Sequence, residues 1–250
     1  MGGLLGIGGG VVAMPVLRFG VGLPPAEAAG TCVAAVLCTT LGGSYRHFRL
    51  GHIDLQRILP IALSGVAATA LFSWAFVWLA RRPHWLDLGM GLIFSLVAIR
   101  LLRDGVREIT KRRSEEVAAL QPAAPLRGRL PTKIAIGTAA GVLPGLFGIG
   151  TGAVLVPAFT LVFGASIKTA VGCSLACFSC NALVSTAFKA AQGHVVLPVA
   201  VPLGIGALLG SNLGAFVNQR TAPSFVRMLF GLVFCYVAGR LVIASLAVMT

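Results

Sequence analysis

Two glycine clusters inside apolar sequence are the strongest candidates for a binding site. One cluster spans 3–10 and the other spans 145–152, and each is followed by a proline, Pro15 or Pro157. Glycine costs a helix interior about 1 kcal/mol relative to alanine, and proline removes a backbone donor. We therefore expect a helix break at each cluster. A half-helix that begins there offers free N–H groups and a positive dipole end, which suit a small oxyanion.

The polar side chains that follow each cluster could complete such an anion site without a fixed charge. For any single glycine, close helix packing is the alternative explanation, and single Ser or Thr residues often bond their own backbone. The predicted substrate-binding residues are Gly6, Gly8, Gly9, Gly10, Cys38 and Thr39 in the first half of the chain, and Gly148, Gly150, Thr151, Gly152, Ser174, Cys180 and Asn181 in the second half.

The clusters belong to an internal repeat that runs well beyond the glycines, at an offset of 145 − 3 = 142 residues. Each copy of a repeat is a structural unit, so the chain is expected to contain two similar halves. Corresponding pairs are Gly22 and Gly164, Cys38 and Cys180, Gly51-His52 and Gly193-His194, and Pro60 and Pro202.

The composition indicates an integral membrane protein. Hydrophobic residues make up 57% of the chain and charged residues 11%, whereas soluble domains have about 45–50% and about 25%. Apolar stretches long enough to cross a bilayer occur at 1–17, 25–45, 58–80, 85–103, 132–163, 166–188, 195–219 and 225–248.

The expected fold class is therefore an all-α integral membrane protein with about eight transmembrane helices. They would form two tandem four-helix repeats, with a glycine-rich break in the first helix of each. Four helices per copy predict parallel repeats, but a glycine segment that does not span would make the count odd and invert the repeats. Both arrangements remain open at this point.

The domain organisation follows from charge and proline content. Residues 1–103 form the first repeat, 132–250 form the second, and the basic, proline-containing segment 104–131 is a linker. The second copy has an apolar run at 134–143 ahead of its glycine cluster, and the first copy has no counterpart. We therefore expect that the first helix lacks part of its N-terminal half.

The formal net charge of +13 would suggest a nucleic-acid partner in a soluble protein. In a membrane protein, Lys and Arg report orientation instead. Their distribution favours a multi-pass protein whose linker is cytoplasmic. We expect the protein to be embedded in the lipid bilayer and to bind no nucleic acid.

The cysteines suggest an alternative function. Cys38 and Cys180 occupy corresponding positions, so a membrane thiol–disulfide electron-transfer protein is the second hypothesis. Cys177 and Cys180 share a helical face, but no second pair or histidine cluster completes a zinc site. A buried cysteine ordinarily behaves as a small hydrophobic residue. We predict no metal and no cofactor.

The charged and titratable residues point to no carboxylate relay. Glu27, Asp87 and Lys189 lie near the ends of predicted spans, where side chains can reach water. Each Gly-His pair predicts a glycine turn with an interfacial histidine. Proton coupling through these histidines is the alternative, because histidine changes charge near neutral pH.

At its glycine clusters the chain resembles the sulfite exporter TauE/SafE family. The matching segments are Gly6-Ile7-Gly8-Gly9-Gly10 with Pro15, then Pro24-Pro25-Ala26-Glu27-Ala28, and Gly51-His52-Ile53-Asp54. In the second copy Thr151 replaces a glycine of the pattern.

The resemblance implies a secondary transporter, not an enzyme, in the cytoplasmic membrane of a bacterium. Its cargo would be sulfite, a sulfonate or another organosulfur anion, carried by alternating access around a site between the two glycine-rich breaks. The substrate, the direction of transport and the oligomeric state, including a homo-oligomer, stay open.

Overall fold

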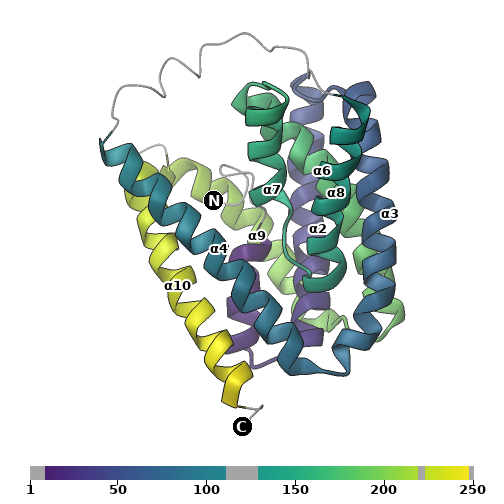
Figure 1. Ribbon diagram of the computed structural model, residues 1–250, viewed down its shortest axis with the longest axis vertical. Coiled ribbons are helices and arrows are strands. Elements are labelled where there is room, and N and C mark those ends of the chain that lie inside the picture. Colours follow the sequence, from purple (N-terminus) through teal and green to yellow (C-terminus); the bar gives the residue numbers. More distant parts are fainter. Residues whose placement is uncertain (1–8, 111–128, 219–222, 248–250) are drawn as a thin grey trace.

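The computed structural model describes residues 9–110, 129–218 and 223–247, and all regular structure in these ranges is helical (Figure 1). Short π-helical segments carry the label η. In chain order the elements are α1 (Gly10–Pro15), η1 (Val16–Gly20), α2 (Pro25–Arg49), α3 (Leu55–Ala80), α4 (Pro83–Thr110), α6 (Leu130–Val142), η2 (Leu143–Phe147), α7 (Gly152–Pro157), η3 (Ala158–Val162), α8 (Ile167–Ala191), α9 (Leu197–Asn218) and α10 (Pro223–Ala247).

Length and hydropathy fit a membrane protein. Five helical segments are long and apolar enough to cross a bilayer: Pro25–Arg49, Ile58–Ala80, Pro83–Arg103, Leu130–Phe147 and Lys168–Ala191. Three shorter apolar stretches are Gly10–Gly20, Leu197–Gly210 and Met228–Ile243. The expectation of an all-helical membrane protein is confirmed for the described residues, whereas the count of eight crossings is not established.

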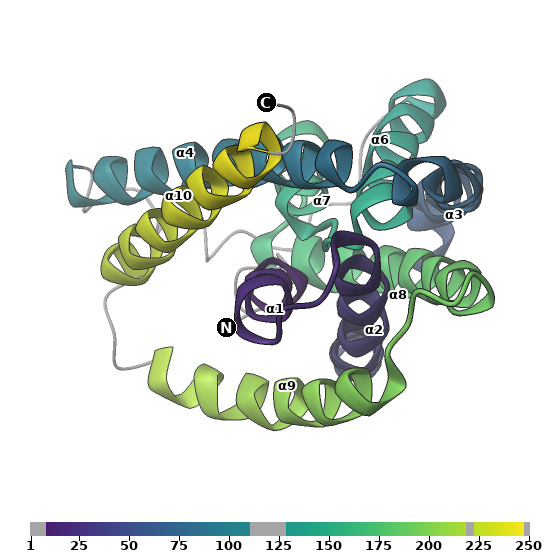
Figure 2. The same cartoon turned by 90° about the horizontal axis from the view of Figure 1, so that it is seen from below.

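Helices α2 and α8, which carry corresponding residues of the two copies, lie side by side and run antiparallel (Figures 1 and 2). Near the start of α2, Gly30 packs against the carbonyl of His194, which follows the end of α8. Near the start of α8, a Cβ at Gly172 would lie 3.1 Å from the Cβ of His47, near the end of α2. The start of each helix therefore lies beside the end of the other.

Corresponding residues make related contacts at the two ends of this pair. The backbone N–H of Val196 donates to Oγ1 of Thr31 at 3.0 Å, so the loop after α8 is held by α2. The thiol of Cys173, which corresponds to Thr31, donates to the carbonyl of His52 at 3.9 Å, so the loop after α2 is held by α8.

Helices α4 and α10 form a second antiparallel pair of corresponding helices. A Cβ at Gly91, early in α4, would meet Leu241 and Val242 late in α10, and Gly231, early in α10, packs against Leu102 late in α4. Figure 2 shows α4 and α10 along one side of the bundle, α9 along the opposite side, and α1 between them.

The predicted broken span 132–163 is in fact two legs that run in opposite directions. Glycines of α6 and of η2, which continues it, pack on α3, with Gly137 against Ser64 and Gly145 against Phe72, so α6 and α3 run in the same direction. At the end of η2, Pro144 contacts Lys189 at the end of α8, so α6 and α8 also share a direction. The chain must therefore reverse through α7 and η3 before α8 begins.

This reversal explains the antiparallel arrangement of α2 and α8. A single broken crossing would have left the two helices parallel, as equal four-helix repeats require. The additional leg inverts every helix that follows it. The glycine break is thus a change of direction and not an interruption within one straight helix.

The predicted glycine turns are confirmed. Gly51 and Gly193 have φ of 70° and 76°, in the left-handed region where glycine is favoured. Each turn ends a long helix, α2 or α8, and sends the chain into the next one.

The predicted linker and the expected N-terminal truncation fall mainly outside the described residues. Within 104–131, α4 continues to Thr110 and α6 begins at Leu130. Residues 1–8, which include Gly6 and Gly8, also lie outside the described part of the chain.

Candidate functional site

The two glycine clusters meet inside the bundle. A Cβ at Gly10 would lie 3.1 Å from the backbone nitrogen of Gly150, which is tighter than ordinary van der Waals contact. Gly148 has a left-handed backbone, with φ of 65°, and packs against the carbonyl of Ala29 at the start of α2. We call this meeting of Gly9 and Gly10 with residues 148–152 the glycine crossing. Position 148 admits only a residue without a side chain, and a Cβ at position 10 would require its neighbour to shift by a few tenths of an ångström.

The two half-helices begin at the crossing with the same hydrogen bonds. The carbonyl of Gly9 accepts from the amides three and four residues later at 3.2 and 2.9 Å, and the carbonyl of Thr151 does the same at 3.0 and 2.9 Å. The first amides of α1 and α7 therefore have no acceptor within their own helices. Both half-helices then pass through a proline into a π-helical turn, η1 or η3.

Two predicted hydroxyl groups on the second-copy side are buried without a hydrogen-bond partner. Thr151 is 0% exposed and caps α7, and Ser174 is 1% exposed on α8, the helix on which α7 packs. A buried hydroxyl left unpaired costs about 1–3 kcal/mol. These hydroxyls are therefore available to a polar ligand.

On the first-copy side the crossing is bordered by Cys32 and Thr39 of α2. The buried thiol of Cys32 donates to the carbonyl of Gly10 at 3.4 Å. Oγ1 of Thr39 lies 4.0 Å from the Cβ position of Gly9 and donates to the carbonyl of Val36 in its own helix at 2.8 Å. Cys32 was not among the predicted residues, although the repeat offset aligns it with Ser174.

Two predicted residues, Asn181 and Cys38, contact other helices. Oδ1 of Asn181 lies 3.0 Å from the Cβ position of Gly65 on α3, and Sγ of Cys38 lies 3.4 Å from that of Gly204 on α9. Cys38 and Cys180 are both exposed free thiols, so no disulfide joins them. Among the described residues no cluster of His, Cys, Asp and Glu could hold a metal ion.

Lys189 adds a buried positive charge next to the crossing. Its side chain is fully buried, and Nζ donates to the carbonyls of Pro144 and Gly145 at 2.9 and 2.6 Å and to Oγ of Ser185 at 2.9 Å. Nζ also lies 4.5 Å from the centroid of the Phe76 ring on α3. The ammonium thus caps the negative end of η2, where the second glycine cluster begins. The expectation that Lys189 reaches water is wrong, because α3 and η2 cover this end of α8.

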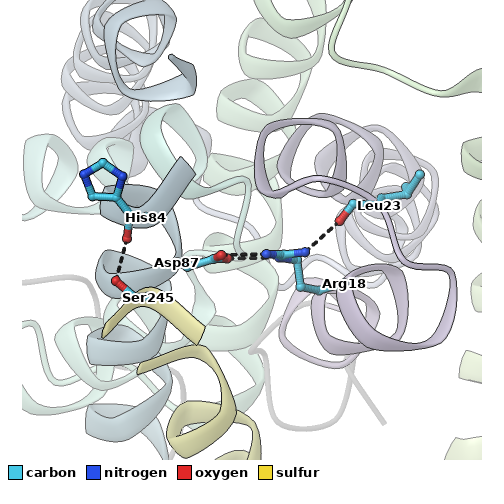
Figure 3. A network of polar contacts seen from close by, with 5 residues as sticks. All are labelled: Arg18, Leu23, His84, Asp87 and Ser245. Atoms are coloured by element: carbon cyan, nitrogen blue, oxygen red, sulfur yellow. Dashed lines mark hydrogen bonds and ion pairs between the residues drawn. The ribbon is translucent and has the colours of Figure 1, made fainter. Parts of the chain in front are cut away.

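Asp87 is also buried, contrary to expectation, and it pairs with Arg18 of η1 (Figure 3). Nε of Arg18 donates to Oδ1 of Asp87 at 3.0 Å and Nη2 donates to Oδ2 at 2.6 Å, while Nη1 donates to the carbonyl of Leu23 at 3.1 Å. This fork-shaped pair ties the first half-helix to α4. In the second copy the corresponding residues are Thr160 and Leu229, so the ion pair belongs to the first copy alone.

The histidines of the two copies have different surroundings. Nδ1 of His47 and Nδ1 of His52 are 3.3 Å apart at the end of α2. His194, in the loop after α8, stacks edge-on against Phe76, with ring centroids 5.5 Å apart. Burial lowers the pKa of His194 below its ordinary value, and the nearby Lys189 lowers it further while Glu27 acts in the opposite direction.

Comparison with known proteins identifies the family. The model of the family described as "Sulfite exporter TauE/SafE" matches residues 1–241. A "probable membrane transporter protein YunE" of Bacillus subtilis (strain 168) is 26% identical, over 97% of this chain and 92% of that protein.

Two further relatives carry similar names. A "probable membrane transporter protein" of Xylella fastidiosa (strain 9a5c) is 30% identical, over 94% of this chain and 87% of its own length. A "probable membrane transporter protein MJ0441" of Methanocaldococcus jannaschii is 24% identical, over 92% and 85%. No solved structure matches the chain. The matched length, the apolar helices and the relatives agree, and the chain belongs to the sulfite exporter TauE/SafE family of membrane transporters.

Proposed function

We propose that the chain is a secondary transporter for a small sulfur-containing anion, such as sulfite or a sulfonate. The observation that carries this proposal is the glycine crossing, where two half-helices of the same design begin against each other inside the bundle. Their first amides, which have no acceptor within their own helices, and the unpaired hydroxyls of Thr151 and Ser174 are neutral donors for oxyanion oxygens. Irregular backbone at membrane depth is tolerated where protein or a watery cavity covers it.

The proposed architecture is a pair of inverted repeats, 1–103 and 132–250, joined by the linker 104–131. Antiparallel packing of α2 with α8 and of α4 with α10 supports this, because corresponding helices run in opposite directions in both pairs. Alternating access would then be a rocking of the repeats around the crossing. Each half-helix would face the anion from its own repeat.

The proposed location is the cytoplasmic membrane of a bacterium, with the linker on the cytoplasmic side. The inside-negative potential favours export of an anion by about 2.3 kcal/mol per charge per 100 mV. Such a gradient is sufficient to drive a carrier, so no enzymatic activity is required.

Flux through the purified protein in liposomes tests the proposal. Wild-type protein should release trapped sulfite or a sulfonate when a membrane potential is imposed. The change Gly10→Leu should abolish this flux, because even the first side-chain atom would lie 3.1 Å from the backbone of Gly150.

Gly206→Leu on α9 is the matched control, because a Cβ at Gly206 would have no neighbour within 4 Å. This control should transport at the wild-type rate. Normal flux in a folded Gly10→Leu protein would remove the crossing from the transport path. Absence of wild-type flux for sulfite and for sulfonates would refute the proposed substrate class.

A further inference from the structure

Lys189 is an ionisable side chain buried inside the bundle, where a charge is costly. An ionised side chain within a membrane helix is expensive, and such residues mark substrate or ion pathways. Lys189 is 0% exposed within an apolar helical segment that is long enough to cross the bilayer. A residue that only held the end of η2 could do so without a positive charge.

The hydrogen bonds of Lys189 leave its charge uncompensated. Its ammonium has three N–H donors, and neutral acceptors occupy all three: the carbonyls of Pro144 and Gly145 and the hydroxyl of Ser185. Within the described ranges no carboxylate pairs with Lys189, whereas Arg18 is neutralised by Asp87. The end of η2 therefore keeps a net positive charge.

This charge lies beside the glycine crossing. Gly145, which accepts from Nζ, is part of the second glycine cluster and precedes the left-handed Gly148. On the other side, Lys189 interacts electrostatically with Cys32, whose thiol contacts Gly10. The ammonium thus contacts the backbone shortly before the second half-helix, and Cys32, which contacts the first half-helix, lies within its electrostatic range.

Among the side chains that the structure describes, no acid is paired with Lys189. Helix α2 presents the Cys32 thiol, α3 presents the Phe76 ring, η2 presents its carbonyls, and the loop after α8 brings His194 within electrostatic range. Glu27 acts on His194 and is not paired with Lys189. An anion that enters from the crossing would therefore supply the counter-ion that the Lys189 ammonium lacks.

We propose that Lys189 is the cationic side chain of the anion site and determines the charge selectivity of transport. This inference rests on the anion transport proposed above. It also gives the two copies unequal roles, since the repeat offset aligns Lys189 with His47, a half-buried residue beside His52. The site would carry a lysine at the end of α8 and a histidine pair at the end of α2.

The variants Lys189→Met and Lys189→His test the inference in liposomes with a sulfonate, whose charge is constant across the pH range used. Lys189→Met should raise the KM for the sulfonate at least tenfold. Lys168→Met, an exposed lysine at the start of the same helix, is the matched control and should keep the wild-type KM.

Lys189→His provides a readout that a purely structural role would not change. Its KM should be low at acidic pH and rise as the new histidine loses its proton, near its ordinary pKa of about 6.5, while the KM of Lys189→Met, which has no titratable group at this position, stays flat. If Lys189→Met fails to fold, as judged by gel filtration, this pH profile decides alone. A wild-type KM in Lys189→Met, or a flat profile in Lys189→His, would overturn the role of Lys189. A wild-type protein that moves no sulfonate or sulfite would instead refute the proposed function.

Discussion

Replacing Asp87 with asparagine should destabilise the protein by about 3 kcal/mol, because Arg18 would be left as an unpaired buried charge. Removing one partner of a buried ion pair costs about 3–5 kcal/mol. The side chains of Arg18 and Asp87 are 21% and 7% exposed, so water can partly compensate the arginine. The lower end of the range is therefore expected.

The double variant Arg18→Met with Asp87→Leu should lose less stability than Asp87→Asn. Replacing both charges by apolar side chains removes the unpaired charge as well as the pair, and such replacements are often nearly neutral. A double-mutant cycle should accordingly give a coupling energy of about 1.5 kcal/mol or more between the two positions.

Equilibrium unfolding in detergent micelles measures these free energies. The control is Arg82→Met in the turn between α3 and α4, where Arg82 is exposed, and it should change stability by less than about 0.5 kcal/mol. An Asp87→Asn protein as stable as the control, or a coupling energy near zero, would show that the pair does not hold η1 against α4.

Two further predictions concern the crossing and its surroundings. Gly148→Ala should lower the free energy of unfolding, because φ is 65° and the Cβ would collide with the carbonyl of Ala29. Gly206→Ala, in an open helical position, should raise the free energy of unfolding by up to about 1 kcal/mol. Equal effects of the two variants would contradict the geometry of the crossing. His194 should make the protein less stable as pH falls below about 6.5, because burial lowers its folded-state pKa and the unfolded chain then binds the proton more readily. Thermal unfolding of His194→Gln should show a smaller loss between neutral and acidic pH, and an unchanged loss would argue against this burial.

Much of the fold could be predicted from residue patterns. The helices follow apolar segments of membrane length, the turns at Gly51 and Gly193 follow from glycine at a helix end, and the duplicated clusters indicated two helix breaks. These features depend on local sequence, where propensity and hydropathy act directly. The repeat offset also contained a residue that was overlooked, since it aligns Cys32 with Ser174.

The direction of the chain after each break could not be predicted from residue types. Glycine and proline indicate where a helix ends. The same residues are found whether the chain continues in the same direction after the break or turns back. The reversal at 148–151 depends on α6 and η2 packing against α3 through Gly137 and Gly145. Parallel and inverted repeats therefore remained equally compatible with the sequence.

The buried charges could not be predicted for a related reason. Arg18 and Asp87 are 69 residues apart in sequence, and each taken alone resembles a residue at a membrane interface. Lys189 is covered by α3 and by the end of η2, which are distant in sequence and contact it only in the folded bundle. Tertiary contacts decide whether a charge near a helix end meets water or protein.

A structure determined with a sulfonate bound would show directly whether the anion binds at the glycine crossing. We expect density for the sulfonate beside the contact of Gly10 with Gly150, with its oxygens at hydrogen-bond distance from the first amides of the half-helices and from Thr151. Sulfonate density elsewhere, for example between α4 and α10, with the two glycine segments still in contact, would contradict this expectation.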